Sequence, residues 1–185
     1  MRCFVAVFPP EEIRAAAADV AGRICTPLTG VKMVPPGNMH LTCRFIGEIP
    51  DGDAARLAGI LGEAGAGFSP FRARFSGLGA FPSVHRASVL WAGLGEGMEG
   101  FMALAGRINS IASRYSQNTA EKPAVPHLTM ARFRAPVDLS RLEVFTELMQ
   151  TGLGVCAISS FALMRSHLGP AGPVYEELCS YGLKP

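Results

Sequence analysis

The sequence predicts an α+β protein with antiparallel or mixed sheets, folded as a single bilobal domain over residues 1–185. Three observations favour this fold class. Strand-like and helix-like segments alternate with hairpins mixed in, a His-Leu-Thr triplet occurs twice, and 185 residues are enough for one domain but not for two of full size. A doubly wound parallel sheet would not contain such hairpins. We therefore expect two halves related by a pseudo-twofold axis, with a central cleft between them.

The first elements follow from local pattern. Residues 2–8 are apolar and β-prone and end at two prolines, which favours a strand buried on both faces. Residues 11–25 carry apolar side chains at helical spacing behind two glutamates, as a first helix should. A loop rich in Pro and Gly over 26–38 then leads to a strand at 39–49, which is rich in aromatic and branched residues.

The middle of the chain continues the alternation. Residues 51–66 are apolar on one face and predict a second helix. Residues 71–81 and 87–94 predict two strands of a hairpin with a longer loop. A third helix is expected over 98–115, and the polar segment 116–126, which ends near two prolines, is expected to be a loop.

The last third of the chain repeats the pattern. Residues 127–135 predict a strand and 139–150 a helix. Two further strands are expected at 155–168 and 174–183, around the turn Gly-Pro-Ala-Gly-Pro at 169–173.

Composition excludes several classes of protein. Apolar residues make up 49% of the chain and charged residues 17%, so the chain can bury enough surface to fold and is not intrinsically disordered. A net charge of +2 is too small for a protein that coats duplex nucleic acid. No uninterrupted apolar stretch reaches the roughly 18 residues of a membrane span, and the start resembles no targeting signal. The five widely spaced cysteines favour reduced thiols in a soluble, cytoplasmic protein.

The paired triplets carry the candidate chemistry. In a strand, residues i and i+2 share a face, so His40 lies beside Thr42, His127 lies beside Thr129, and the intervening leucines enter the core. Two histidines supply a general acid and a general base near neutral pH, as hydrolysis of a phosphodiester requires. The threonine hydroxyls are suited to donate to phosphoryl oxygens. We therefore expect both histidines to be catalytic and both threonines to bind phosphate.

Two arginines follow the triplets and extend the phosphate site. Arg44 lies four residues after His40 and shares its face in a regular strand. Arg132 lies five residues after His127 and shares that face only through a bulge or at a strand end. Strand alternation alone thus favours Arg44 over Arg132, and both are candidates for phosphate contact.

Other side chains leave alternatives open. The sequence has no metal-binding spacing such as Cys-x-x-Cys, and alternation turns Cys43 away from the nearby histidine, so we expect no metal site. His85 and His167 lack a threonine partner and are expected in a loop and at a strand end. Phe45, Phe133 and Trp91 are candidates to stack on a nucleobase, but the odd offsets of Phe45 and Phe133 from the histidines favour the core for these two.

Five segments of the sequence are similar to those of a known family. The segments MVPPGNMHLTCRFIGEI, GLGAFPS, VLWAGL, PHLTMARFR and MRSHLGPAGPVYEEL, in this order over nearly the whole chain, are similar to the RNA 2′,3′-cyclic phosphodiesterases. These enzymes belong to the 2H phosphoesterase superfamily, which is defined by paired HXTX motifs and was historically called the 2′-5′ RNA ligases.

The resemblance implies a bilobal fold with both motifs in a central cleft. It implies metal-independent opening of a 2′,3′-cyclic phosphate to a 2′-phosphomonoester, without a cofactor. In the family, the first histidine (here His40) protonates the departing 3′ oxygen and the second (here His127) activates water. The family's second motif continues to Arg132, so the resemblance favours Arg132 as a phosphate ligand. At the position of Arg44, many relatives have lysine. The expected partners are RNA 3′ ends with a cyclic phosphate or small cyclic nucleotides, bound by a monomer and without a membrane.

Two rival functions remain from the sequence. The same groups can promote 2′-5′ RNA ligation, the reverse joining of RNA ends. Alternatively, the chain is a non-catalytic module that binds nucleotides or RNA ends, although both motifs are intact.

Overall fold

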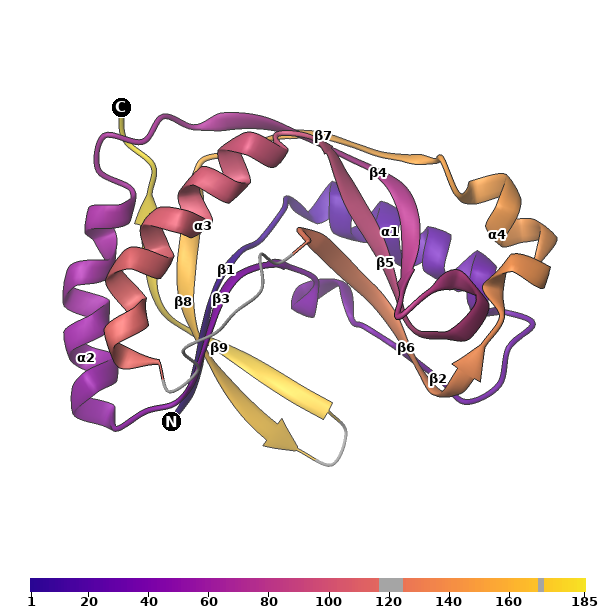
Figure 1. Ribbon diagram of the computed structural model, residues 1–185, viewed down its shortest axis with the longest axis horizontal. Helices are drawn as coiled ribbons and strands as arrows, with labels where there is room; N and C mark the ends of the chain where they lie inside the picture. Colours follow the sequence, from indigo (N-terminus) through magenta and orange to yellow (C-terminus); the bar gives the residue numbers. More distant parts are fainter. Residues whose placement is uncertain (117–124, 170–171) are drawn as a thin grey trace.

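A computed structural model describes residues 1–116, 125–169 and 172–185 of the chain (Figure 1). The helices are α1 (Glu11–Cys25), α2 (Asp51–Ile60), α3 (Met98–Ala112) and α4 (Glu143–Leu148). The strands are β1 (Arg2–Val7), β2 (Val31–Met33), β3 (Leu41–Glu48), β4 (Phe71–Phe81), β5 (Ala87–Glu96), β6 (His127–Val137), β7 (Gly152–Ile158), β8 (Ser160–Gly169) and β9 (Gly172–Gly182). The structure thus confirms an α+β protein.

Within the described ranges, the strands form one nine-stranded sheet in the order β7-β4-β5-β6-β3-β1-β8-β9, with β2 paired to β6. All pairings inside the sheet are antiparallel. β3 and β6 lie at the centre and are joined by a single residue pair, Leu41 with Leu128. The sheet therefore consists of two halves of four path strands each, connected at one point.

The helices cover the two halves in a crossed manner. α2 and α3 lie beside the half that contains β1, β3, β8 and β9, whereas α1 and α4 lie beside the half of β4 to β7 (Figure 1). α1 follows β1 in the chain yet packs on β6 and β7, and α3 follows β5 yet packs on β3. Each half of the sheet is thus covered by a helix that the chain delivers from the other half.

The main hydrophobic core runs through both halves and includes the fully buried Phe75, Phe101, Phe145 and Phe161. A smaller cluster on the opposite face of β1 contains Phe4, Ala6, Ala162 and Met164, with Phe8 and Tyr175 packed against it. All five cysteines belong to the described residues and are free, as the sequence predicted. No helix among the described residues is both long and apolar enough to cross a lipid bilayer.

Among the strands, two segments differ from the sequence-based prediction. The loop expected over 26–38 contains β2, a three-residue strand paired with β6. The single strand expected over 155–168 is two strands, since β7 pairs with β4 in one half and β8 pairs with β1 in the other. The chain passes between the halves at Ser159, a change of partner that leaves no mark on an apolar, β-prone sequence.

Helix α1 has the predicted bounds, and the other three helices are shorter than predicted. The helices predicted over 51–66 and 98–115 end as α-helices at Ile60 and Ala112, and each is followed by a 3₁₀ turn. The helix predicted over 139–150 is a 3₁₀ turn followed by α4. Residues 117–124 of the predicted loop and residues 170–171 of the predicted Gly-Pro turn lie outside the described residues.

Candidate active site

The single pair between the two halves brings the His-Leu-Thr triplets together. Leu41 of β3 and Leu128 of β6 are antiparallel partners, and both leucines are fully buried in the core. Because successive side chains of a strand point to opposite faces, the histidine and threonine on either side of each leucine lie on the other face. The local twofold relation of an antiparallel pair thus gathers these four side chains around one point.

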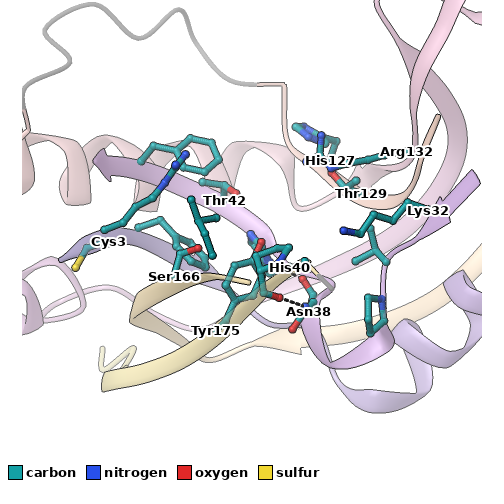
Figure 2. Close-up of a pocket in the computed structure, with 18 of the residues that line it drawn as sticks. Cys3, Lys32, Asn38, His40, Thr42, His127, Thr129, Arg132, Ser166 and Tyr175 are labelled. Atoms are coloured by element: carbon teal, nitrogen blue, oxygen red, sulfur yellow. Dashed lines mark hydrogen bonds between the residues drawn. The ribbon is translucent and has the colours of Figure 1, made fainter. Parts of the chain in front are cut away.

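The four side chains line one cleft of about 690 Å³ (Figure 2). His40 and Thr42 reach it from one half of the sheet, and His127 and Thr129 from the other. The β8–β9 hairpin contributes Tyr175 and Ser166, and β2 contributes Lys32. The remaining lining residues are Arg2, Cys3, Phe4, Met33, Val34, Pro35, Asn38, Phe45, Gly47, Glu48, Arg132, Leu168, Gly172 and Pro173.

Each histidine ring is fixed by the same local hydrogen bond. The Nδ1 of His40 lies 2.7 Å from the carbonyl oxygen of Asn38, and the Nδ1 of His127 lies 2.8 Å from that of Val125. A carbonyl oxygen can only accept, so Nδ1 carries the hydrogen in both rings. The Nε2 of each neutral ring is left with a lone pair that can take up a proton.

Aromatic rings surround His40 closely. The ring centroids of Phe4, Phe8 and Tyr175 lie 4.9, 5.3 and 5.3 Å from that of His40. Burial among these rings is the largest cause that lowers the pKa of His40, to about 4, and it outweighs the opposing hydrogen bond to the backbone. The positive charges of His127 and Arg132 lower this pKa further.

His127 has a similar but less enclosed environment. Its ring lies 4.9 Å from Phe81 and 6.2 Å from Trp91, measured between centroids. Burial is again the largest cause that lowers the pKa of His127, and the charge of Arg132 adds to it. Burial thus favours the neutral form of both imidazoles, and a proton on one opposes a proton on the other.

A β-bulge in β3 reverses the expected positions of Arg44 and Phe45. Thr42 pairs with Ala6 and Arg44 pairs with Val5, so Cys43 is an extra residue and the alternation shifts after it. Arg44 is consequently 5% exposed, faces the core side, and donates a hydrogen bond to the Oδ1 of Asn109 in α3. The expectation that Arg44 shares the face of His40 is thus wrong. Phe45, expected in the core, is 54% exposed and lines the cleft.

A matching bulge in β6 brings Arg132 into the cleft. Thr129 pairs with Trp91 and Ala131 pairs with Leu90, so Met130 is the extra residue. The shift turns Arg132 toward the cleft, which strand alternation allowed only through such a bulge. The fifth residue after each histidine therefore faces the cleft in both halves, and it is Arg132 in one half and Phe45 in the other.

The other histidines lie outside the cleft, as expected. The Nδ1 of His85 lies 3.0 Å from the Oγ of Ser140, and the Nε2 of His167 lies 2.7 Å from a carboxylate oxygen of Glu176. Phe133 is buried, in agreement with the prediction. Among the described residues, no group of three or more His, Cys, Asp or Glu side chains is arranged to hold a metal ion.

Sequence reasoning missed several cleft residues. Lys32 belongs to a strand that was expected to be loop, and Tyr175 reaches the cleft only because β9 returns beside β8. The proline-rich lead-in before His40 was the one available signal, since it placed Asn38 and its carbonyl oxygen next to the first motif.

Comparison with known proteins gives a consistent result. Residues 7–91 match the family model of LigT-like phosphoesterases. The RNA 2′,3′-cyclic phosphodiesterase of Thermus thermophilus is 36% identical over 190 residues, covering 100% of this chain and 91% of the relative. The enzyme of the same name from Methanothermobacter thermautotrophicus is 30% identical and covers 96% of each chain.

Solved structures agree with these relatives. A crystal structure from Thermus thermophilus has a TM-score of 0.76 and 34% sequence identity, and it covers 99% of this chain and 98% of that one. E. coli LigT in complex with 3′-AMP has a TM-score of 0.77 and 26% identity, and it covers 100% of this chain and 98% of that one.

Proposed function

Because this chain belongs to the LigT-like phosphoesterase family, as its motifs predicted, we propose that it is an RNA 2′,3′-cyclic phosphodiesterase. Its substrates are RNA 3′ ends that carry a 2′,3′-cyclic phosphate, or small cyclic nucleotides. The product is the 2′-phosphomonoester. The relatives that share the full length of the chain carry this name, and the cleft has the residues that such a reaction needs.

One observation carries the proposal: the antiparallel pair Leu41–Leu128 sets two His-x-Thr units around one cleft. A cyclic phosphate needs a base on one side and an acid on the other, because the attacking water and the departing oxygen lie on opposite sides of phosphorus. Two histidines related by a local twofold axis meet this requirement.

In the proposed reaction, the oxygen of a water molecule bonds to phosphorus while the bond from phosphorus to the 3′ oxygen breaks. His127 takes a proton from the water at Nε2, and His40 gives a proton from Nε2 to the 3′ oxygen. The pair carries one proton in the substrate complex, because the anionic phosphate raises both histidine pKa values while each imidazolium lowers that of the other. After turnover the proton has moved from one ring to the other, and exchange with solvent restores the starting state.

The remaining residues hold the phosphate. We assign the hydroxyls of Thr42 and Thr129 and the guanidinium of Arg132 to its non-bridging oxygens, where negative charge increases as water attacks. Arg44 is left out of this set because it faces Asn109 and the core. No step requires a metal ion or an organic cofactor.

The difference between the two halves orients the nucleotide. Arg132 offers a cation on one side, and Phe45 offers an exposed aromatic face at the corresponding place on the other. A nucleobase stacked on Phe45 sets its ribose next to His40, so the ribose oxygen departs on the side of that ring. This supports the acid role that the family resemblance implies for His40.

A direct assay tests the proposal. An oligonucleotide with a 2′,3′-cyclic phosphate is incubated with the protein in EDTA, and the products are separated as 2′- and 3′-phosphates. We expect turnover in EDTA with the 2′-phosphate as product. Complete loss of turnover on chelation contradicts the metal-free reaction, and a 3′-phosphate product contradicts the assigned leaving oxygen.

The same preparation separates the rival functions. Ligation yields 2′-5′ linkages from a cyclic end and a 5′-hydroxyl end, and linkage-sensitive digestion detects them. A binding module retains the unchanged oligonucleotide after long incubation. We expect hydrolysis to dominate, since both His-x-Thr units face the cleft.

A further inference from the structure

Lys32 and Arg132 form a pair of positive charges on the wall of the cleft. They are direct partners in the antiparallel pairing of β2 with β6, and directly opposite residues share one face of the sheet. Both line the cleft, and Figure 2 shows the Lys32 side chain running from its strand into the cleft toward the two motifs. The pairing thus sets a second cation beside the arginine assigned to phosphate.

In the part of the chain that the structure describes, no ion pair balances the charge of these two residues. Like charges directly opposite on neighbouring strands are destabilising. Elsewhere the strands neutralise their arginines: Arg72 and Arg74 both face Glu96. Within residues 1–116, 125–169 and 172–185, neither Lys32 nor Arg132 forms an ion pair.

The β8–β9 hairpin sets the position of the Lys32 ammonium group. A Cβ atom at Gly172 would lie only 2.7 Å from the Nζ of Lys32, so the lysine lies directly against the backbone of β9. The side-chain amide of Asn38 donates to the carbonyl oxygen of Pro173 at 3.0 Å and holds that strand next to the first motif. The ammonium group therefore lies between β6 and the hairpin, where an anion in the cleft can reach it.

We propose that Lys32 is a further phosphate-binding residue, which acts with Arg132 to favour a doubly charged phosphate over a singly charged one. This inference rests on the proposed function, because the phosphate in question is that of the proposed cyclic substrate and its product. The cyclic substrate is a phosphodiester with one negative charge. The species formed by attack of deprotonated water carries about one more negative charge, and so does the phosphomonoester product. Two adjacent cations thus stabilise the transition state and the product more than the substrate.

The test measures anion binding without turnover. Binding of inorganic phosphate, which is mainly a dianion at about pH 8, is compared with binding of dimethyl phosphate, which is a monoanion, by calorimetry at constant ionic strength. We expect Lys32→Gln to weaken the binding of inorganic phosphate about tenfold and that of dimethyl phosphate by a smaller factor. Lys32→Arg should restore most of the lost affinity. Lys184→Gln, at an exposed lysine near the C-terminal end, is the control and should bind both anions as the wild type does.

A purely structural role for Lys32 gives a different result. If the lysine only holds the hairpin against β2, Lys32→Gln lowers the unfolding midpoint of the free protein. We expect this midpoint to stay the same or rise, because the substitution removes repulsion from Arg132. The inference is overturned if Lys32→Gln binds phosphate as the wild type does, if it weakens the binding of both anions equally, or if it lowers the unfolding midpoint. It is also overturned if the wild type does not bind inorganic phosphate at about 50 mM.

The proposed function fails separately. A wild-type protein that shows Lys32-dependent binding of inorganic phosphate, but no hydrolysis of the cyclic oligonucleotide, contradicts the enzyme and leaves the phosphate pair standing. Where hydrolysis is present, we expect Lys32→Gln to lower kcat more than it raises KM, because the pair favours the charge of the transition state.

Discussion

At the scale of the residue, the cleft depends on two imidazoles with the same tautomer but different surroundings. His40 and His127 each donate Nδ1–H to a carbonyl oxygen two residues earlier, and aromatic rings enclose His40 more fully than His127. A shared tautomer makes the two rings chemically alike, and unequal burial makes the protonated form of His40 less favourable than that of His127.

The first prediction concerns the action of the two rings as one unit. We expect His40→Ala and His127→Ala each to lower kcat by about 10²-fold or more, and the double variant to lose little more than either single variant. His85→Ala is the control, because that exposed ring contacts Ser140 outside the cleft. Single-turnover rates on a cyclic-phosphate oligonucleotide measure the effect, and losses that multiply in the double variant would contradict the pairing.

The second prediction concerns stability against pH. Burial lowers the pKa of His40 to about 4 in the folded state, whereas in the unfolded chain this pKa is about 6.5. As the pH falls below about 6.5, the unfolded state binds the proton first, so stability is present at neutral pH and is lost toward pH 4.

Urea unfolding at about pH 7 and about pH 5 tests this sign. The shift corresponds to about 2 kcal/mol lost over that interval, and His40→Gln should show a correspondingly smaller loss than the wild type. His167→Gln serves as the comparison, since its ring is paired with Glu176 on the exposed hairpin. The idea fails if His40→Gln has the same pH dependence as the wild type.

At the scale of the element, two bulges decide which side chains meet the substrate. An extra residue in β3 sends Arg44 to Asn109, and an extra residue in β6 sends Arg132 to the cleft. The two arginines follow similar motifs in the sequence and have opposite surroundings in the structure.

A pair of substitutions tests the effect of the bulges. Arg44→Ala should lower the free energy of unfolding by about 1–3 kcal/mol, because it removes a buried side chain together with its hydrogen bond to Asn109. Arg132→Gln should leave stability nearly unchanged and lower kcat/KM by about tenfold or more. Denaturant titration and steady-state kinetics on both variants test this, and the reverse pattern would contradict the roles assigned to the two arginines.

A further prediction concerns the support of His127 by β4. An added Cβ atom at Gly79 would overlap the six-membered ring of Trp91, which lies next to the imidazole. Gly79→Ala should therefore displace the indole and lower kcat by about tenfold without any contact to substrate.

Two variants control this experiment. Gly106→Ala, on α3 where an added Cβ meets no atom within 4 Å, should keep full activity and stabilise the helix. The double variant Gly79→Ala/Trp91→Phe should recover part of the lost activity, because the smaller ring leaves room for the methyl group. Full activity in Gly79→Ala alone would show that the indole does not position His127.

At the scale of the whole molecule, the two halves are interlocked. α1 packs on the half opposite to β1, which precedes it, and α3 packs on the half opposite to β5. The core residues of both halves belong to one cluster. We therefore propose that residues 1–185 are one folding unit, and that one chain holds the complete site.

This proposal predicts one cooperative transition and activity as a monomer. Unfolding monitored at Trp91, in one half, and by far-UV circular dichroism should give the same midpoint. Specific activity should stay constant on dilution through the range in which sedimentation shows a monomer. Two separated transitions, or activity that falls on dilution, would contradict the single unit or the monomer.

The sequence determined the fold class and the centre of the site. Alternating apolar patterns predicted most strands and helices, and the repeated triplet predicted that His40, Thr42, His127 and Thr129 face one cleft, because alternation along a strand is a local property. Pairing between distant strands decided the rest. The bulges at Cys43 and Met130, the change of partner at Ser159, and the placing of Lys32 opposite Arg132 all depend on which strand lies alongside, and the order of residues in one strand does not record its neighbour.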